Sequence, residues 1–146
     1  MKRKDFRLTS IYDDPEAVEK FVEFIGSVKA SPVKLSDYLN RKLEEKGLSQ
    51  PEVCRRADMD RQLLNRLAQV GSDARACKET LMRIAIGMTA TENEANELLD
   101  TCGFKFEMSK AKDLAYLFCI RNGYYNIYYV YDIVEMIKEK EQDRKL

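Results

Sequence analysis

The chain has 146 residues, and its 25 lysines and arginines balance its 25 aspartates and glutamates. Small DNA-binding domains are usually basic, so this balance argues against strong non-specific phosphate binding but leaves room for a local basic face. Histidine is absent, and no nucleophile, acid–base constellation or glycine-rich phosphate loop stands out. We therefore expect a protein that is not an enzyme and uses no cofactor.

The first 33 residues are predicted to form an N-terminal arm with one helix. Alternating apolar residues over 5–12 suggest a short strand or extended segment, and a helix is expected over 14–28, where Asp14 caps and Pro15 begins the first turn. Ser31 and Pro32 then interrupt the chain. No apolar run reaches the ~18–20 residues of a membrane span, so we expect a cytoplasmic protein with no membrane contact.

Residues 34–104 are predicted to form a compact core of five helices. Apolar positions recur at helical spacing, and two capping boxes, Ser49 with Glu52 and Thr91 with Glu94, mark helix starts. The expected helices are 35–46, 50–57, 61–69, 76–88 and 92–102.

The most informative segment is 47–67, which is typical of two short helices joined by a tight turn. The second helix has an apolar side at Leu64 and Leu67. Its polar side carries Arg61, Gln62, Asn65 and Arg66. A helix-turn-helix presents its recognition helix to a DNA groove in this way. Glutamine and asparagine can pair with adenine through two hydrogen bonds, and arginine with guanine.

Residues 35–99 resemble the Cro/phage-repressor family of helix-turn-helix domains. The matching positions are Gly47-Leu48-Ser49-Gln50, Ala57, Met59, Arg61, Leu64, Arg66, Leu67, Gly71 and Leu81-Met82-Arg83-Ile84-Ala85. The resemblance implies that Gln50 contacts a phosphate and that Arg61, Gln62 and Asn65 face bases. It assigns Arg66 to the DNA backbone.

The sequence departs from that family at several positions of the motif. Cys54 replaces a small residue of the first helix, and Asp58 replaces the glycine of the turn. Asp58 and Asp60 place negative charge at the entry to the groove, and the apolar Leu63 is expected to face DNA. A helix-turn-helix used for protein contact would tolerate these residues, so both uses stay open.

Residues 35–137 also resemble the C-terminal helical module of some bacterial macro-domain proteins. Its marks are Glu52-Val53, Arg56-Ala57, Met59-Asp60-Arg61, Leu63, Leu98-Leu99, Cys102-Gly103-Phe104 and Gly123-Tyr124-Tyr125-Asn126-Ile127-Tyr128. This likeness implies a bacterial signalling or defence context. The chain has no room for a macro domain, so ADP-ribose binding does not carry over.

Residues 105–146 are predicted to form a helical pair, 110–122 and 127–141, packed on the core. A charge run over 138–145 is expected to be a solvated, frayed helix end. Tyrosines crowd this region at 116, 124, 125, 128, 129 and 131. They suit a core with solvated hydroxyls, a dimer or partner surface, or, less well, stacking on single-stranded bases.

The four cysteines are Cys54, Cys77, Cys102 and Cys119. No pair has zinc-ligand spacing and no histidine completes a site, so no metal site is expected. They lie among apolar residues or at helix ends, which predicts buried free thiols in a reducing compartment.

The sequence as a whole predicts an all-α fold: a repressor-like five-helix core, an N-terminal helical arm and a C-terminal helical pair. The function expected first is a sequence-specific transcriptional regulator that binds double-stranded DNA as a homodimer. The alternative is a helical protein-interaction module in a bacterial signalling or defence assembly.

Overall fold

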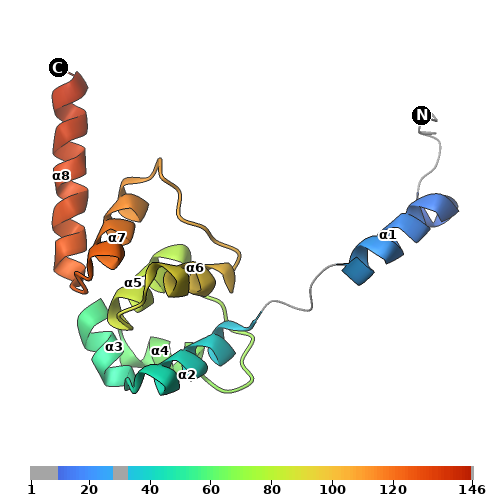
Figure 1. Cartoon of the computed structure of the whole chain (residues 1–146), viewed down its shortest axis with the longest axis horizontal. Helices are drawn as coiled ribbons and strands as arrows, with labels where there is room; N and C mark the ends of the chain where they lie inside the picture. The colour runs from blue at the N-terminus through green and yellow to red at the C-terminus, as the bar shows by residue number, and fades with distance from the viewer. Residues whose placement is uncertain (1–9, 28–32, 146) are drawn as a thin grey trace. The chain divides into compact units, whose positions relative to one another are not determined.

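The computed structural model describes residues 10–27 and 33–145, with side chains as far as residue 142. Within these ranges the protein is all-α, with eight α-helices, one short 3₁₀ helix and no strand (Figure 1). Contacts divide the chain into two units, with the boundary between residues 32 and 33.

The first unit contains the 3₁₀ helix η1 (Ile11–Asp13) and helix α1 (Pro15–Ser27). The predicted helix 14–28 is confirmed over these bounds, with an Asp14 carboxylate oxygen accepting from the Ala17 N–H at 3.1 Å. The extended segment predicted for 5–12 is wrong over 11–12, although Ser10 itself is extended. There the Ser10 side chain caps a 3₁₀ turn. Residues 5–9 lie outside the described ranges.

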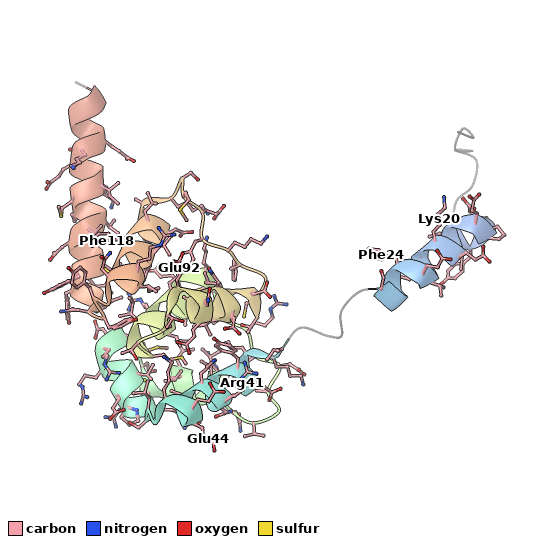
Figure 2. The ribbon with its side chains drawn as sticks, in the orientation of Figure 1. Lys20, Phe24, Arg41, Glu44, Glu92 and Phe118 are labelled. Atoms are coloured by element: carbon pink, nitrogen blue, oxygen red, sulfur yellow. The ribbon has the colours of Figure 1, made fainter. Side chains whose placement is uncertain are left out.

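Helix α1 has an apolar face that is open to solvent. Phe21, Val22, Phe24 and Ile25 are each more than half exposed, and no described residue of α1 is buried. Phe24 and the polar Lys20 are both labelled on this helix in Figure 2. Within its own unit, the apolar side of α1 is thus exposed.

The second unit contains the other seven helices (Figure 1). They are α2 (Leu35–Lys46), α3 (Gln50–Ala57), α4 (Arg61–Leu67), α5 (Lys78–Gly87), α6 (Glu92–Asp100), α7 (Ala111–Asn122) and α8 (Ile127–Lys145). The two predicted capping boxes are confirmed at the starts of α3 and α6.

Five of these helices differ in length from the sequence prediction, α7 only because it starts at Ala111 and not at residue 110. Helix α4 ends at Leu67 because the Asn40 side chain binds the Ala68 carbonyl at 2.6 Å. Helix α6 ends at Asp100, where the Thr101 hydroxyl donates to the Leu98 carbonyl. Helix α5 starts at Lys78 after an extended Cys77. The charge run stays helical, so α8 reaches Lys145.

Helix α5 is the central support of this unit, in contact with α3, α6 and α7. Its approach to α3 depends on Gly87, because an added Cβ would lie 2.7 Å from Val53 Cγ1 and closer still to the Val53 carbonyl oxygen. The Arg56 guanidinium donates to the Gly87 carbonyl at 2.8 Å. Helix α3 is thus held at a fixed depth on α5.

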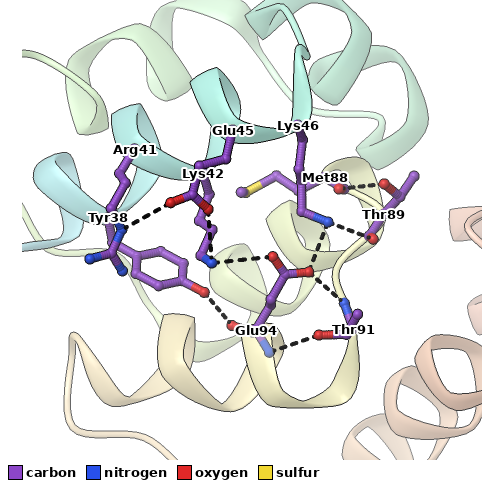
Figure 3. Close-up of polar contacts among 9 residues, drawn as sticks. All are labelled: Tyr38, Arg41, Lys42, Glu45, Lys46, Met88, Thr89, Thr91 and Glu94. Carbon is purple, nitrogen blue, oxygen red and sulfur yellow. Dashed lines mark hydrogen bonds and ion pairs between the residues drawn. The ribbon is translucent and has the colours of Figure 1, made fainter.

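A polar cluster joins α2 to α6 across the core (Figure 3). The Tyr38 hydroxyl donates to the Glu94 carbonyl at 2.9 Å, and Lys46 pairs with the Glu94 carboxylate at 2.8 Å. Burial alone would raise the pKa of Glu94, but Lys46 and the Thr91 N–H outweigh it and lower that pKa. The carboxylate that caps α6 therefore also fixes α2.

The C-terminal pair is joined to α5 through a buried carboxylate. Asp113 of α7 is buried, pairs with Lys78 of α5, and accepts from the Glu107 N–H at 2.6 Å. From α8, Ile127, Val130 and Val134 enter the same apolar cluster as the core helices. Helices α2 to α8 thus share one core.

Candidate nucleic-acid interface

Helices α3 and α4 are joined by three residues, two of which are acidic and end or begin a helix. Asp58 adopts a left-handed conformation with φ 49° and ends α3, at the position where glycine is usual. Asp60 is the N-cap of α4, since its carboxylate accepts from the Gln62 N–H at 3.1 Å. Asp60 therefore stabilises the start of α4, whereas Asp58 is tolerated in a backbone conformation that glycine adopts more easily.

The predicted contact residues of α4 lie on its solvent side. Leu64 and Leu67 are buried, at 0% and 1% exposed, and hold the helix against the core. Arg61, Gln62, Asn65 and Arg66 are all exposed. Their side chains form no ion pair or hydrogen bond with any residue in the described ranges. All four are therefore available to a partner.

Gln50 lies apart from these four, at the start of α3, and is half-buried. The capping box already occupies two backbone N–H groups at this helix terminus. The Ser49 hydroxyl accepts from the Glu52 N–H, and the Glu52 carboxylate accepts from the Ser49 N–H at 3.1 Å. A phosphate at Gln50 would meet the Glu52 carboxylate. The phosphate contact implied by the resemblance remains a prediction, with that charge against it.

Leu63 is less exposed than its polar neighbours on α4. It is half-buried and packs against the apolar core. Leu63 is thus partly withdrawn from the exposed side of α4, and whether it faces DNA stays a prediction.

Arg83 of α5 supports the turn, and sequence reasoning missed it. Its guanidinium donates to the Asp58 carbonyl at 3.2 Å and lies over the Tyr131 ring, 5.7 Å from its centroid. It thereby links the turn between α3 and α4 to α8. Arg83 lies outside the apolar positions of α5, and the sequence pattern therefore gave no indication of this role.

The aromatic residues of α7, α8 and the loop between them separate into a buried set and an exposed set. Tyr116 is buried, while Phe118, Tyr124, Tyr128 and Tyr129 are exposed. Phe118, Tyr124 and Tyr129 follow one another with ring centroids 6.0 and 5.8 Å apart. We call these four exposed residues the aromatic surface; Figure 2 labels Phe118 on it.

Three cysteines are buried as predicted, but Cys77 is exposed. Burial raises the pKa of the Cys54 and Cys119 thiols. The Cys77 thiol lies 3.2 Å from the Thr80 hydroxyl, and hydrogen bonds from Thr80 lower its pKa. The prediction of four buried thiols is wrong for Cys77, because it occupies the extended N-cap position of α5.

The part of the chain that the structure describes contains no group of three potential metal-ligating side chains. In that part, too, no helix has the length and apolar character to cross a membrane. Comparisons with known protein families, with curated proteins and with solved structures found no match. The function proposed next therefore depends on the surface chemistry of this chain alone.

Proposed function

We propose that this protein is a sequence-specific DNA-binding regulator of the helix-turn-helix type. In this proposal α2 to α6 form a repressor-like core, α1 is an arm, and α7 with α8 is a C-terminal pair. The observation that carries it is the exposed side of α4, where Arg61, Gln62, Asn65 and Arg66 have no partner among the described residues.

Three of the four side chains are placed to contact bases, and the fourth to contact the phosphate backbone. Arg61 and Gln62 occupy the first turn of α4, the part of a recognition helix that meets base edges. Asn65 lies one turn on and can form two hydrogen bonds to adenine, as Gln62 can, while Arg61 can do so to guanine. Arg66, further along, is suited to a phosphate.

The charges around α4 favour selective over general DNA binding. Asp58 and Asp60 are exposed beside the arginines, and they offset attraction to any phosphate backbone. A protein with this surface gains little from counterion release and depends on base contacts. This accounts for a DNA-binding face on a chain of zero net charge.

The aromatic surface supports a homodimer within the same proposal. Tyr is enriched in the cores of protein interfaces. The exposed rings of Phe118, Tyr124 and Tyr129 are neighbours on α7, α8 and the loop between them, and Tyr128 is also exposed on α8. Two copies related by a two-fold axis would present two α4 helices to half-sites about one helical turn apart.

A protein-interaction module is the second candidate, favoured by α1. Its exposed phenylalanines and aliphatic residues stand beside Glu16, Glu19 and Glu23. A helix of 13 residues is marginal in water without a packing partner. If the protein acts in a signalling or defence assembly, α1 is the element we expect to engage the partner.

Selection from random duplex DNA tests the proposal. The wild-type chain should enrich a defined site, and Arg61→Ala should weaken binding to that site by about 1–3 kcal/mol. Arg41→Ala is a matched control, since Arg41 is exposed on α2 and pairs with Glu45. A folded protein that enriches no sequence at low salt would contradict the proposal and favour the interaction module.

A further inference from the structure

The Arg83 guanidinium contacts both the turn before α4 and the C-terminal helix. It donates to the Asp58 carbonyl at 3.2 Å, and its central carbon lies 5.7 Å from the centroid of the Tyr131 ring on α8. The Asp58 carbonyl belongs to the peptide that leads into Met59 and Asp60, and Asp60 is the N-cap of α4. The direction in which α4 begins therefore depends on a side chain that α8 also holds.

The Tyr131 ring connects Arg83 to the exposed aromatic surface. Tyr128 lies one turn earlier on α8, edge-on to Tyr131, with ring centroids 6.0 Å apart. Tyr131 is half-buried, whereas Tyr128 is 61% exposed and belongs to the aromatic surface. A protein surface that covers Tyr128 would therefore also restrict the Tyr131 ring and remove water from around it.

Arg83 has an alternative partner on its own helix. The Glu79 carboxylate, one turn earlier on α5, lies 3.9 Å from the guanidinium, too far for a hydrogen bond, and pairs with Lys112 at 3.1 Å. The Arg83 side chain is 26% exposed, so it has room to move toward Glu79. Two discrete arrangements are therefore available to Arg83, and only one keeps the hydrogen bond to Asp58. Coupling between two sites requires an element of this kind.

Covering the aromatic surface would favour the arrangement that holds the turn. The attraction between a guanidinium and an aromatic ring is stronger where water is removed. A second copy packed on Tyr128 would therefore keep Arg83 over Tyr131 and bonded to Asp58. The first turn of α4, which carries Arg61, would then be held in one position before DNA binds. A preorganised surface binds more tightly because it loses less conformational entropy on binding.

We propose that a second copy docked on Tyr128 strengthens DNA recognition by α4 of the same subunit, with Tyr131 and Arg83 as the positioning residues between them. This inference rests on the DNA-binding function and the dimer proposed above, and it names self-association as the regulator of the DNA-binding face. By thermodynamic linkage, DNA on α4 strengthens the dimer by the same factor. The coupling acts within each subunit and is separate from the gain of binding two half-sites at once.

The first test needs no DNA. The full ¹⁵N-labelled chain is diluted across the range in which sedimentation shows the change from dimer to monomer. The Met59 amide, which shares a peptide group with the Asp58 carbonyl, and the Arg61 amide should change their shifts with the dimer fraction. Arg83→Met should still dimerise but lose these changes. Arg83→Lys, which retains a cation and a donor, should restore them in part.

The second test measures binding to a duplex with a single half-site, so that the gain from two half-sites is absent. The affinity per subunit should be about fivefold higher for the dimer than for the monomer, and Arg83→Met should remove this difference. Arg75→Met is the matched control, because Arg75 also donates to a backbone carbonyl, that of Cys102 at 2.8 Å, outside the turn before α4. It should lose a similar hydrogen bond and keep the fivefold difference.

The two tests separate the coupling from the proposed function. Met59 shifts that follow the dimer fraction and vanish in Arg83→Met support the coupling. A wild-type chain that stays monomeric, or that dimerises with an unmoved Met59 amide, overturns it, as does equal half-site affinity in the two states. If the folded chain binds no duplex at all, the DNA-binding function fails, and the Met59 shifts alone decide whether contact on α8 reaches the turn before α4.

Discussion

The exposed side of α4 and the aromatic surface of α7 and α8 are two solvent-facing regions built on the same helix, α5. The first is polar and charged, with Arg61, Gln62, Asn65 and Arg66 exposed, and the second is aromatic. Polar side chains that lack partners suit recognition of base edges and phosphates, whereas exposed rings suit another protein surface. One small core can therefore support two kinds of contact. Both depend on α5, which packs against α3 on one side of the unit and against α7 in the C-terminal pair.

The largest effect should follow from a change in that shared support. Gly87→Ala places a methyl group against Val53 of α3, where no space exists, so α3 must move away from α5. We expect a loss of about 1–3 kcal/mol in the free energy of unfolding, measured with denaturant. Gly26→Ala is the control, because an added Cβ there meets nothing within 4 Å. Equal stability of Gly87→Ala and the wild type would show that α3 and α5 are not closely packed.

A change in the aromatic surface should separate the two regions. Tyr128 is 61% exposed and lies edge-on to Tyr131, with ring centroids 6.0 Å apart. If the protein is a dimer through this surface, Tyr128→Glu should weaken the dimer by about 2 kcal/mol, as for other interface tyrosines. Sedimentation at micromolar concentration would then show a fall toward the monomer mass. Lys140→Glu, on the same helix, is the matched control, and a wild-type monomer would exclude this dimer.

A smaller effect is expected at the turn before α4. Asp58→Gly relieves a left-handed conformation and should stabilise the protein by about 0.5–1 kcal/mol. It should also strengthen DNA binding by removing a negative charge near Arg61. Asp58→Asn removes the same charge while retaining a side chain that tolerates this conformation, so it separates charge from strain. Unchanged DNA affinity in both variants would place Asp58 away from the DNA.

The smallest effects concern thiol reactivity. Cys77 is exposed and hydrogen bonds from Thr80 lower its pKa, so more of it is thiolate at pH 7 than in an ordinary cysteine. A thiol reagent should label Cys77 quickly and the other three cysteines only on unfolding. Thr80→Val should raise the Cys77 pKa and slow its labelling near neutral pH. Equally fast native labelling of Cys54 or Cys119 would contradict their burial.

Periodicity and caps predicted the helices because both are local. The capping boxes of Ser49 with Glu52 and Thr91 with Glu94 were visible as four-residue patterns. The ends of α4 and α6 were misplaced because Asn40 and Thr101 terminate them, and the Asn40 contact spans 28 positions in sequence. The same locality explains why Asp14 and Pro15 predicted the start of α1 but gave no sign of its exposed apolar face.

The candidate site was predictable in part, for a related reason. The exposed residues of α4 followed from the apolar spacing of Leu64 and Leu67. The supporting role of Arg83 did not, because its partners Asp58 and Tyr131 are 25 and 48 positions away in the chain. The burial of Leu63 likewise depends on tertiary packing. The exposed side of α4 was thus predictable from the sequence, whereas the contacts that support it became visible only in the folded structure.

The most direct test of the central claim is the salt dependence of duplex DNA binding, measured by fluorescence anisotropy for the wild type and for Arg66→Ala. If Arg66 contacts a phosphate, its loss should weaken binding to every sequence and reduce the slope of log affinity against log salt by about one. Arg41→Ala should leave the slope unchanged. A wild-type protein that is folded and binds no duplex at low salt, or an Arg66→Ala variant with the wild-type slope and affinity, would contradict the claim that α4 meets DNA.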